Sequence, residues 1–247
     1  MMQIVIHKSL HKAFEKAHAA SGSLAARAIS SSSKARAAGM CCFLAACIAS
    51  LTTACAEGSG TDAATIVVVA TTSEPDAVFP PFALNMEARQ ATELMYEYLA
   101  DVGPAMNTIG DKGFVKEIAS DRKWSDDSLS IAYSINPSAR WQDGVQLTSR
   151  DVRFSYELYG DSKVGWNDLS SLSEIDSVTA PDSSTAVFWF AKRTPHQFAD
   201  AASTMLILPA HLLERIPRDS LRAVTALMTP VGSGRYRAGT WNKGTSF

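Results

Sequence analysis

The clearest alternation of apolar and polar residues lies at 127–135, DSLSIAYSI. Its large apolar side chains fall on one face and its serines on the other, which predicts a half-buried antiparallel strand. The large residues are Leu129, Ile131, Tyr133 and Ile135. A continuous β-branched run at 65–71, TIVVVAT, predicts a strand buried on both faces.

Other segments show the periodicity of further strands and of helices. Residues 86–100, MEARQATELMYEYLA, carry apolar side chains at helical spacing, at positions 91, 94, 95, 98 and 99. Trp124 leads into the alternating strand, and the turn APDSS separates two more strand-like runs. Those two runs are 173–179 and 185–191. Short helices are predicted at 195–204, 209–216 and 219–227. A further strand is predicted to begin after the glycine turn at 230–234.

The stretch 139–157, ARWQDGVQLTSRDVRFSYE, combines a tight turn with a helix start. Asp143-Gly144 supplies the turn, and Thr148 or Ser149 can cap the next helix. Asp151 would then face the positive end of the helix dipole, at a spacing that approaches a capping box. Every residue here has a scaffold role, so we assign no catalysis to this stretch.

The cysteines all lie near the N-terminus, and the 192 residues after the last of them contain none. Residues 37–55 follow a basic pair and are uncharged, small and apolar, which is typical of a signal peptide. LTTAC at 51–55 resembles a lipobox, and we prefer Cys55 as the lipidated residue. LAAC, ending at Cys47, is the alternative, and a plain signal peptide or a membrane helix with incidental cysteines also stays open.

Charge and residue types exclude several other functions. The formal net charge is −2, and residues 1–55 carry +5, which leaves −7 for residues 56–247 and argues against a nucleic-acid partner. The body has two histidines, His196 and His211, too few for a histidine metal site, and no cofactor motif. VGSGR at 231–235 lacks the ending of a phosphate loop, and no G-x-S-x-G elbow occurs. Asp126-Asp127 fits a solvated turn better than a catalytic pair.

The order of these pieces is more specific than any one of them. It runs from the lipobox-like cysteine through WSDDSLSIAYSI, ARWQDGVQLTSRDVRFSYE and LILPAHLL to PVGSGRYRAGTW. This order resembles family 5 of the bacterial extracellular solute-binding proteins, which includes the oligopeptide-, dipeptide- and nickel-binding components of ABC importers. The resemblance covers about residues 64–243 and implies a mixed α/β (α+β) fold, the first lobe of a periplasmic-binding-protein-like structure.

The resemblance also implies a domain division. Residues 1–55 would be the signal peptide, 56–64 a flexible tether, and 65–247 the N-terminal part of lobe I, without the second lobe. Family members usually run to about twice this length, so we expect a fragment, a truncated gene or a half completed by another chain. The protein would be exported, periplasmic or at the cell surface, and held at the membrane by lipid on Cys55.

The function implied is capture of a peptide or a similar small solute and its delivery to an ABC permease, without catalysis. In the family, the loop after the first strand lines the cleft. Here that loop follows the prolines at 75, 80 and 81, which predict an extended path with free backbone groups. The expected ligand-binding residues are Phe82, Ala83, Leu84, Asn85 and Met86.

Two rival functions remain. A secreted hydrolase would need a nucleophile beside His196 or His211. A non-binding fragment would expose apolar surface where a missing segment should pair. Trp166 and Trp189 could line a pocket, but core packing is the expected role of both.

Overall fold

The computed structural model describes Val69 and residues 71–242. The predicted signal peptide, Cys55 and the tether therefore lie outside the described residues, as does most of the strand predicted at 65–71. Val69 and Thr71, the two residues of that segment that are described, are not in a strand.

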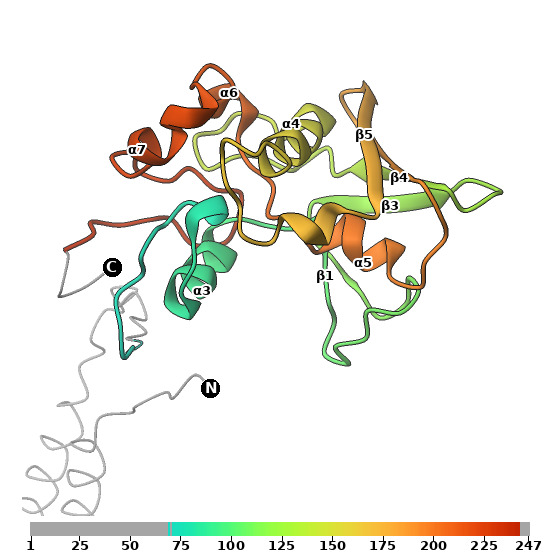
Figure 1. Ribbon diagram of the computed structural model, residues 1–247, viewed down its shortest axis with the longest axis horizontal. Coiled ribbons are helices and arrows are strands. Elements are labelled where there is room, and N and C mark those ends of the chain that lie inside the picture. The colour runs from blue at the N-terminus through green and yellow to red at the C-terminus, as the bar shows by residue number, and fades with distance from the viewer. Residues whose placement is uncertain (1–68, 70, 243–247) are drawn as a thin grey trace, which may run out of the picture. The chain divides into compact units, whose positions relative to one another are not determined.

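The larger sheet of the described fold has four antiparallel strands and lies on the right in Figure 1. The strand order is β3-β4-β6-β5, so the two later strands add to one side of the first hairpin. Ile131 of β4 pairs with Trp124 of β3 on one side and with Phe188 of β6 on the other. The bounds are β3 Ala119–Trp124, β4 Ser130–Ile135, β5 Ile175–Asp182 and β6 Thr185–Phe190. The last three confirm the strands predicted at 127–135, 173–179 and 185–191.

One face of the sheet carries the core. Tyr133 of β4 lies edge-on to Phe188 of β6, with ring centroids 5.6 Å apart, and 5.9 Å from Phe198 of helix α5, Gln197–Ala202. Helix α4, Ser149–Tyr159, packs against β5 and β6. Alternation in β4 and β6 dictates this arrangement, because every second side chain must point to the same face.

The opposite face of the sheet is open. Trp189 of β6 is 43% exposed, and its indole N–H donates to the Thr179 hydroxyl of β5 at 3.1 Å. The expectation that Trp189 packs in the core is therefore wrong, because the side chain of Trp189 points to the solvent-exposed face of β6. Trp166 is half-buried and packs edge-on against Tyr159, with centroids 4.6 Å apart, as expected.

The turn and helix predicted at 139–157 are present. Gly144 adopts φ 91°, in the left-handed region that favours glycine, and its N–H donates to Trp141 O at 2.9 Å. Thr148 is the N-cap residue of α4, and the Asp151 carboxylate accepts from the Thr148 backbone N–H at 2.8 Å. This confirms the capping role of the Thr148–Asp151 pair.

The helix predicted over 86–100 is shorter than its periodicity suggested. Helix α3 spans Met86–Met95, and Tyr96 is already extended. The backbone beyond it hydrogen-bonds to distant segments: Ile118 N–H donates to Tyr98 O at 3.2 Å, and Ile207 N–H to Glu97 O at 3.0 Å. Short strands β1, Ala100–Asp101, and β2, Val115–Lys116, follow and pair with each other.

The last third of the described chain is built from short helices and irregular segments. The three helical stretches predicted there, at 195–204, 209–216 and 219–227, are present as helices of about half the predicted length. The emerging strand predicted after the glycine turn does not form, and residues 229–241 are irregular. The remaining elements are η2 Leu169–Leu172, α6 Ala210–Leu213, η3 Arg218–Ser220 and α7 Leu221–Thr225.

Candidate functional site

The loop expected to bind ligand is folded back on itself rather than extended. We call residues 76–85 the hook. The rings of Phe79 and Phe82 lie 5.5 Å apart across the short helix η1, Pro80–Phe82, which begins with two prolines. Asp76 closes the hook, because its carboxylate accepts from the backbone N–H groups of Leu84 at 3.2 Å and of Asn85 at 3.5 Å.

Residues 82–85 of the hook offer no free backbone donors. Phe82 N–H donates to Phe79 O at 2.9 Å, and Ala83 N–H to Pro80 O at 3.3 Å. Together with the two donors held by Asp76, the N–H groups of 82–85 are all occupied within the chain. The expectation of an extended segment with free N–H groups is therefore wrong, and ligand pairing with these donors would require the hook to open.

The side chains of the five expected residues divide into two groups. Phe82 is 2% exposed, with the Arg222 guanidinium 4.2 Å from its ring centroid, and Ala83 is also buried. Leu84 is 46% exposed and Met86 63% exposed, so these two can reach a ligand.

Asn85 fixes the direction in which helix α3 leaves the hook. Its side-chain oxygen caps α3 by accepting from Ala88 N–H at 2.8 Å, while its amide nitrogen donates to Glu74 O at 2.8 Å. The structure thus places Leu84, Asn85 and Met86 on a rigid corner at the start of α3.

The irregular residues 229–241, which we call the C-terminal segment, pass close to the C-terminal end of α3. Gly234 N–H donates to Met95 O at 2.8 Å, and Tyr236 N–H to Leu94 O at 3.2 Å. Gln142 holds the same segment from the opposite side, because its amide nitrogen donates to Gly234 O at 3.0 Å and its backbone N–H donates to Gly232 O at 2.9 Å. These hydrogen bonds do not follow the regular pattern between two strands, so the C-terminal segment does not form a strand.

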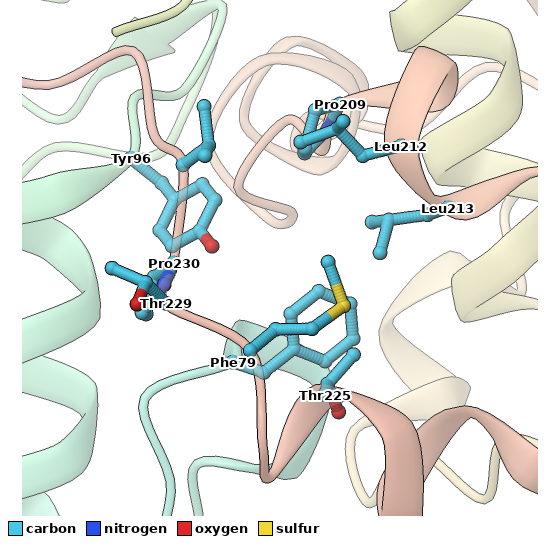
Figure 2. A pocket seen from close by; sticks show the side chains of 10 residues that line it. Phe79, Tyr96, Pro209, Leu212, Leu213, Thr225, Thr229 and Pro230 are labelled. Carbon is cyan, nitrogen blue, oxygen red and sulfur yellow. The ribbon is translucent and has the colours of Figure 1, made fainter. Parts of the chain in front are cut away.

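A small apolar pocket lies beside the hook (Figure 2). Its walls come from Phe79, from Tyr96 just after α3, from helix α6 and from residues 228–231. The Tyr96 ring is 2% exposed, and burial raises its pKa well above the usual range. The pocket thus lies between Phe79 of the hook and residues 228–231.

Carboxylates gather near the end of α3 and β2. Burial raises the pKa of Glu117 to about 7, against the hydrogen bond that its carboxylate accepts from Tyr98 N–H at 2.7 Å, and the nearby Glu97 and Asp101 add to the increase. Burial also raises the pKa of Glu97, while Ser233 and Arg235 oppose the increase. With a pKa of about 7, Glu117 is therefore partly protonated near neutral pH.

His211, one of the two histidines of the body, pairs with a carboxylate of the Asp143-Gly144 turn. His211 Nε2 lies 2.8 Å from Asp143 Oδ2, and its Nδ1 is buried without a hydrogen-bond partner in the described part of the chain. Burial favours a higher pKa for Asp143, but hydrogen bonds from His211 and Val145 N–H lower it overall. This pair ties the Asp143-Gly144 turn to α6.

His196 lies beside the Thr108 hydroxyl and close enough to the Asp200 carboxylate for their charges to interact. Its Nδ1 lies 3.3 Å from the Thr108 hydroxyl at an exposed position, and no carboxylate among residues 71–242 hydrogen-bonds to the ring. A nucleophile–base pair needs a third group to orient the base. The described residues also contain no cluster of three or more His, Cys, Asp or Glu suited to a metal ion, and none of their helices is long and apolar enough to cross a membrane.

Sequence reasoning missed three residues that shape this region: Asp76, Tyr96 and Gln142. Asp76 follows a proline in a turn, where aspartate commonly accepts backbone hydrogen bonds, so that signal was available. Tyr96 and Gln142 had no such signal, because their partners lie far away in sequence.

Solved structures define the class of fold. The oligopeptide-binding protein AppA of Bacillus subtilis, solved with a nonapeptide, superimposes with a TM-score of 0.63 at 21% identity, over 70% of this chain and 34% of that one. NikZ of Campylobacter jejuni, solved with Ni(L-His), gives a TM-score of 0.54 at 24% identity, over 69% and 32% of the two chains. The described fold is therefore that of part of a periplasmic-binding-protein lobe, as predicted.

The particular family follows from the sequence. Residues 113–247 match the middle region of the bacterial extracellular solute-binding proteins, family 5. This match spans more than half of the chain, and the chain belongs to that family. Members of the family are solute-binding proteins.

Two relatives show how much of a family member is present. A Brucella ovis protein named as an ABC transporter peptide-binding protein is 29% identical over 127 residues, which is 51% of this chain and 24% of the relative. DdpA of Escherichia coli, named as a D,D-dipeptide-binding periplasmic protein, is 25% identical over 183 residues, or 72% and 34%. The chain thus spans about a quarter to a third of the length of these relatives.

Proposed function

We propose that this chain belongs to the substrate-binding component of an ABC importer and contributes to capturing a peptide or a similar small solute outside the cytoplasmic membrane. The family match over residues 113–247 carries the proposal. In this mechanism no bond is made or broken. Ligand binding shifts the protein towards a closed conformation that a membrane permease recognises.

The ligand contact on this chain is assigned to the corner formed by Leu84, Asn85 and Met86, with Phe82 and Ala83 as its buried support. Two observations support this assignment. Leu84 and Met86 expose apolar surface next to a hook that is closed by Asp76, so binding costs little ordering of the backbone. Phe82 anchors the hook in the core, which keeps the exposed residues in place.

Export and lipid anchoring complete the proposal. The apolar run at 37–55 would direct export, and lipid on Cys55 would hold the protein at the membrane surface near its permease. Family membership supports an extracytoplasmic location, and the lipobox-like LTTAC supports the anchor.

Isothermal titration calorimetry with a peptide library tests the capture of solute, with this chain and with the product of its whole gene. We expect saturable binding and no cleavage of the peptides by mass spectrometry. Leu84→Ser should weaken binding about tenfold, because about 1–2 kcal/mol of apolar contact is lost. Leu169→Ser is the matched control, since Leu169 is 41% exposed on η2 and should leave affinity unchanged.

Turnover of the peptides would refute the proposal, and equal losses in the two leucine variants would refute the assigned contact. The anchor has its own test in the mass of the mature protein expressed in a bacterial host. Cys55→Ser should abolish lipid addition and membrane association, whereas Cys47→Ser should preserve both. The reverse pattern would move the anchor to Cys47.

A further inference from the structure

The segment between β1 and β2 exposes large apolar side chains. We call residues 102–110, VGPAMNTIG, the tip, and none of its side chains is ionisable. Met106 is 76% exposed and Ile109 is 60% exposed. Figure 1 shows the segment that follows β1 at the lower edge of the fold. Apolar side chains exposed together on a projecting segment are typical of surfaces that contact a protein partner or a membrane.

The polar side chains of the tip are engaged within the chain. The Asn107 side-chain oxygen accepts from Ile109 N–H at 3.0 Å, and the Asn107 amide nitrogen donates to Ile109 O at 3.3 Å. The Thr108 hydroxyl lies 3.3 Å from His196 Nδ1. Removal of water from the tip would therefore leave both polar side chains with their partners, which lowers the cost of moving it into an apolar environment.

The base of the tip is fixed to the rest of the fold. Gly110 N–H donates to Pro195 O at 2.8 Å. The Asp111 carboxylate accepts from Arg122 Nε and from Trp124 Nε1, both at 3.3 Å. The exposure of the apolar side chains is thus held in place by hydrogen bonds to β3 and to the residues before α5.

Met106 occupies a backbone conformation that does not favour methionine. Its φ is 52°, in the left-handed region, where long side chains are rare and glycine, asparagine and aspartate are more common. The Met106 N–H donates to Gly103 O at 2.8 Å, which closes the turn. Such conformations cluster at functional positions, because the fold alone would select another residue. The exposed methionine therefore points to a role outside the fold.

We propose that the tip inserts Met106 and Ile109 into the boundary between headgroups and acyl chains of a phospholipid membrane. A membrane of this kind accepts a segment that carries no charge and whose polar groups are paired internally. A protein partner would ordinarily form hydrogen bonds with the polar side chains of its contact surface, and those of the tip are already engaged.

The direction of the chain agrees with this occupant. The start of the described chain and the segment after β1 both lie at the lower edge of the fold in Figure 1. Thr71 lies 16 residues after Cys55. An extended chain of that length spans at most about 55 Å, so attachment at Cys55 keeps the body close to the membrane. The proposal rests on the extracytoplasmic location proposed above and is independent of peptide capture.

NMR of the full chain, labelled with ¹³C at its methionine methyl groups, tests the contact. The chain is mixed with phosphatidylcholine bicelles that contain a lipid with a nitroxide on its acyl chain. We expect the Met106 methyl signal to lose most of its intensity and the signal of Met86, which is 63% exposed, to keep most of its own. The loss should persist at high salt, because apolar contact is not screened.

Two aspartate variants separate the tip from the apolar run at 37–55, which can itself bind lipid. Ile109→Asp should lower the membrane-bound population of the tip about tenfold, the effect of withdrawing one large apolar side chain, and should restore the Met106 signal. Leu227→Asp is the matched control, since Leu227 is 91% exposed on another segment and should leave the Met106 loss unchanged.

A third variant tests whether the methionine serves the fold. Met106→Asn suits the left-handed conformation, so its melting temperature should equal or exceed that of the wild type. A lower melting temperature would contradict the inference that Met106 is kept for an external contact.

The proposal is overturned if the Met106 signal loses no more intensity than the Met86 signal, or if Ile109→Asp and Leu227→Asp behave alike. A Met106 signal that the nitroxide lipid leaves intact would assign the tip to a protein partner instead. Peptide capture is measured separately by calorimetry, so failure of either proposal is recognised without the other.

Discussion

Replacing Asp151 with alanine removes the acceptor that joins two parts of the fold. One carboxylate oxygen accepts from the backbone N–H of Thr148 at 2.8 Å and from its hydroxyl at 3.2 Å. The other accepts from Ala210 N–H at 3.0 Å, at the start of α6. Asp151 is 4% exposed and Ala210 1% exposed, so water cannot readily replace these bonds in the variant.

The magnitude follows from the loss of the capping interaction with Thr148 and of the hydrogen bond from Ala210 N–H. Removal of a helix-capping group costs about 1 kcal/mol, and a buried N–H left unpaired costs about 1–3 kcal/mol. Burial raises the pKa of Asp151 although hydrogen bonds from Thr148 and Ala210 oppose the increase, so the ionised group is itself disfavoured in the fold at neutral pH. This offsets part of the loss, and we expect the free energy of unfolding to fall by about 2–3 kcal/mol.

Urea unfolding at pH 7, followed by far-UV circular dichroism, measures this change. Asp151→Asn should give an intermediate value, because it keeps one oxygen acceptor. Arg153→Ala is the control on the same helix; it breaks only the exposed pair with Glu157 at 3.4 Å and should cost about 0.3–0.5 kcal/mol. A midpoint for Asp151→Ala equal to that of Arg153→Ala would refute the reasoning that this carboxylate links α4 to α6.

Three further changes have definite expected outcomes. The folded-state pKa of Glu117, about 7, exceeds its ordinary value of 4.5, so the folded chain binds the proton more tightly than the unfolded chain does. Stability should therefore decline as pH rises between these two values. Melting temperatures measured from about pH 4.5 to 8 should show this decline in the wild type and a flatter one in Glu117→Gln. Gly232→Ala should free the C-terminal segment to limited proteolysis, because a Cβ there would lie 1.7 Å from Met95 O, whereas Gly239→Ala, with nothing within 4 Å, should not. Tyr159→Phe should lower the free energy of unfolding by about 1 kcal/mol in urea, because the buried hydroxyl donates to Leu206 O at 3.2 Å; an unchanged midpoint would refute that contribution.

The elements that sequence predicted well are those whose signals are local. The alternation at 127–135 specifies β4, because exchanging its faces would expose Ile131 and Tyr133, both 0% exposed. Thr148 and Asp151 specify the start of α4 within four residues. Neither inference needed knowledge of a distant segment.

The end of α3 shows where local signals fail. Apolar residues continue at helical spacing to Leu99, but the chain becomes extended at Tyr96. Leu99 N–H donates to Ala202 O at 3.1 Å, and Ala119 N–H donates to Leu99 O at 3.0 Å. These two partners satisfy the backbone of Leu99 as well as a helix would. One of them, Ala202, lies more than 100 residues further along the chain. Periodicity alone cannot distinguish the two outcomes.

The hook also differs from its sequence-based prediction, here because of hydrogen bonds between residues that are closer in sequence. Prolines at 75, 80 and 81 correctly indicated an irregular loop, since they restrict φ and remove donors. They did not indicate that Asp76 would accept from the N–H groups of Leu84 and Asn85, eight and nine residues further along the chain. The candidate ligand corner therefore keeps its residues, but it would bind through exposed side chains instead of an open strand edge.

The stretch VGSGR at 231–235 gains a physical explanation that its sequence alone did not supply. Its two glycines resemble the start of a phosphate loop, but the residues that end such a loop are missing. In a phosphate loop, backbone N–H groups point at an anion beside the N-terminus of a helix. Here the N–H groups of Gly234 and Tyr236 instead donate to the carbonyls of Met95 and Leu94, at the C-terminus of α3. Those carbonyls belong to the last turn, where they lack intrahelical partners and carry partial negative charge. Glycine is required because a Cβ at Gly234 would lie 2.7 Å from Leu94 O. The same small residues that let a loop approach phosphate thus let this segment close the end of a helix, and the partner determines which role the pattern has.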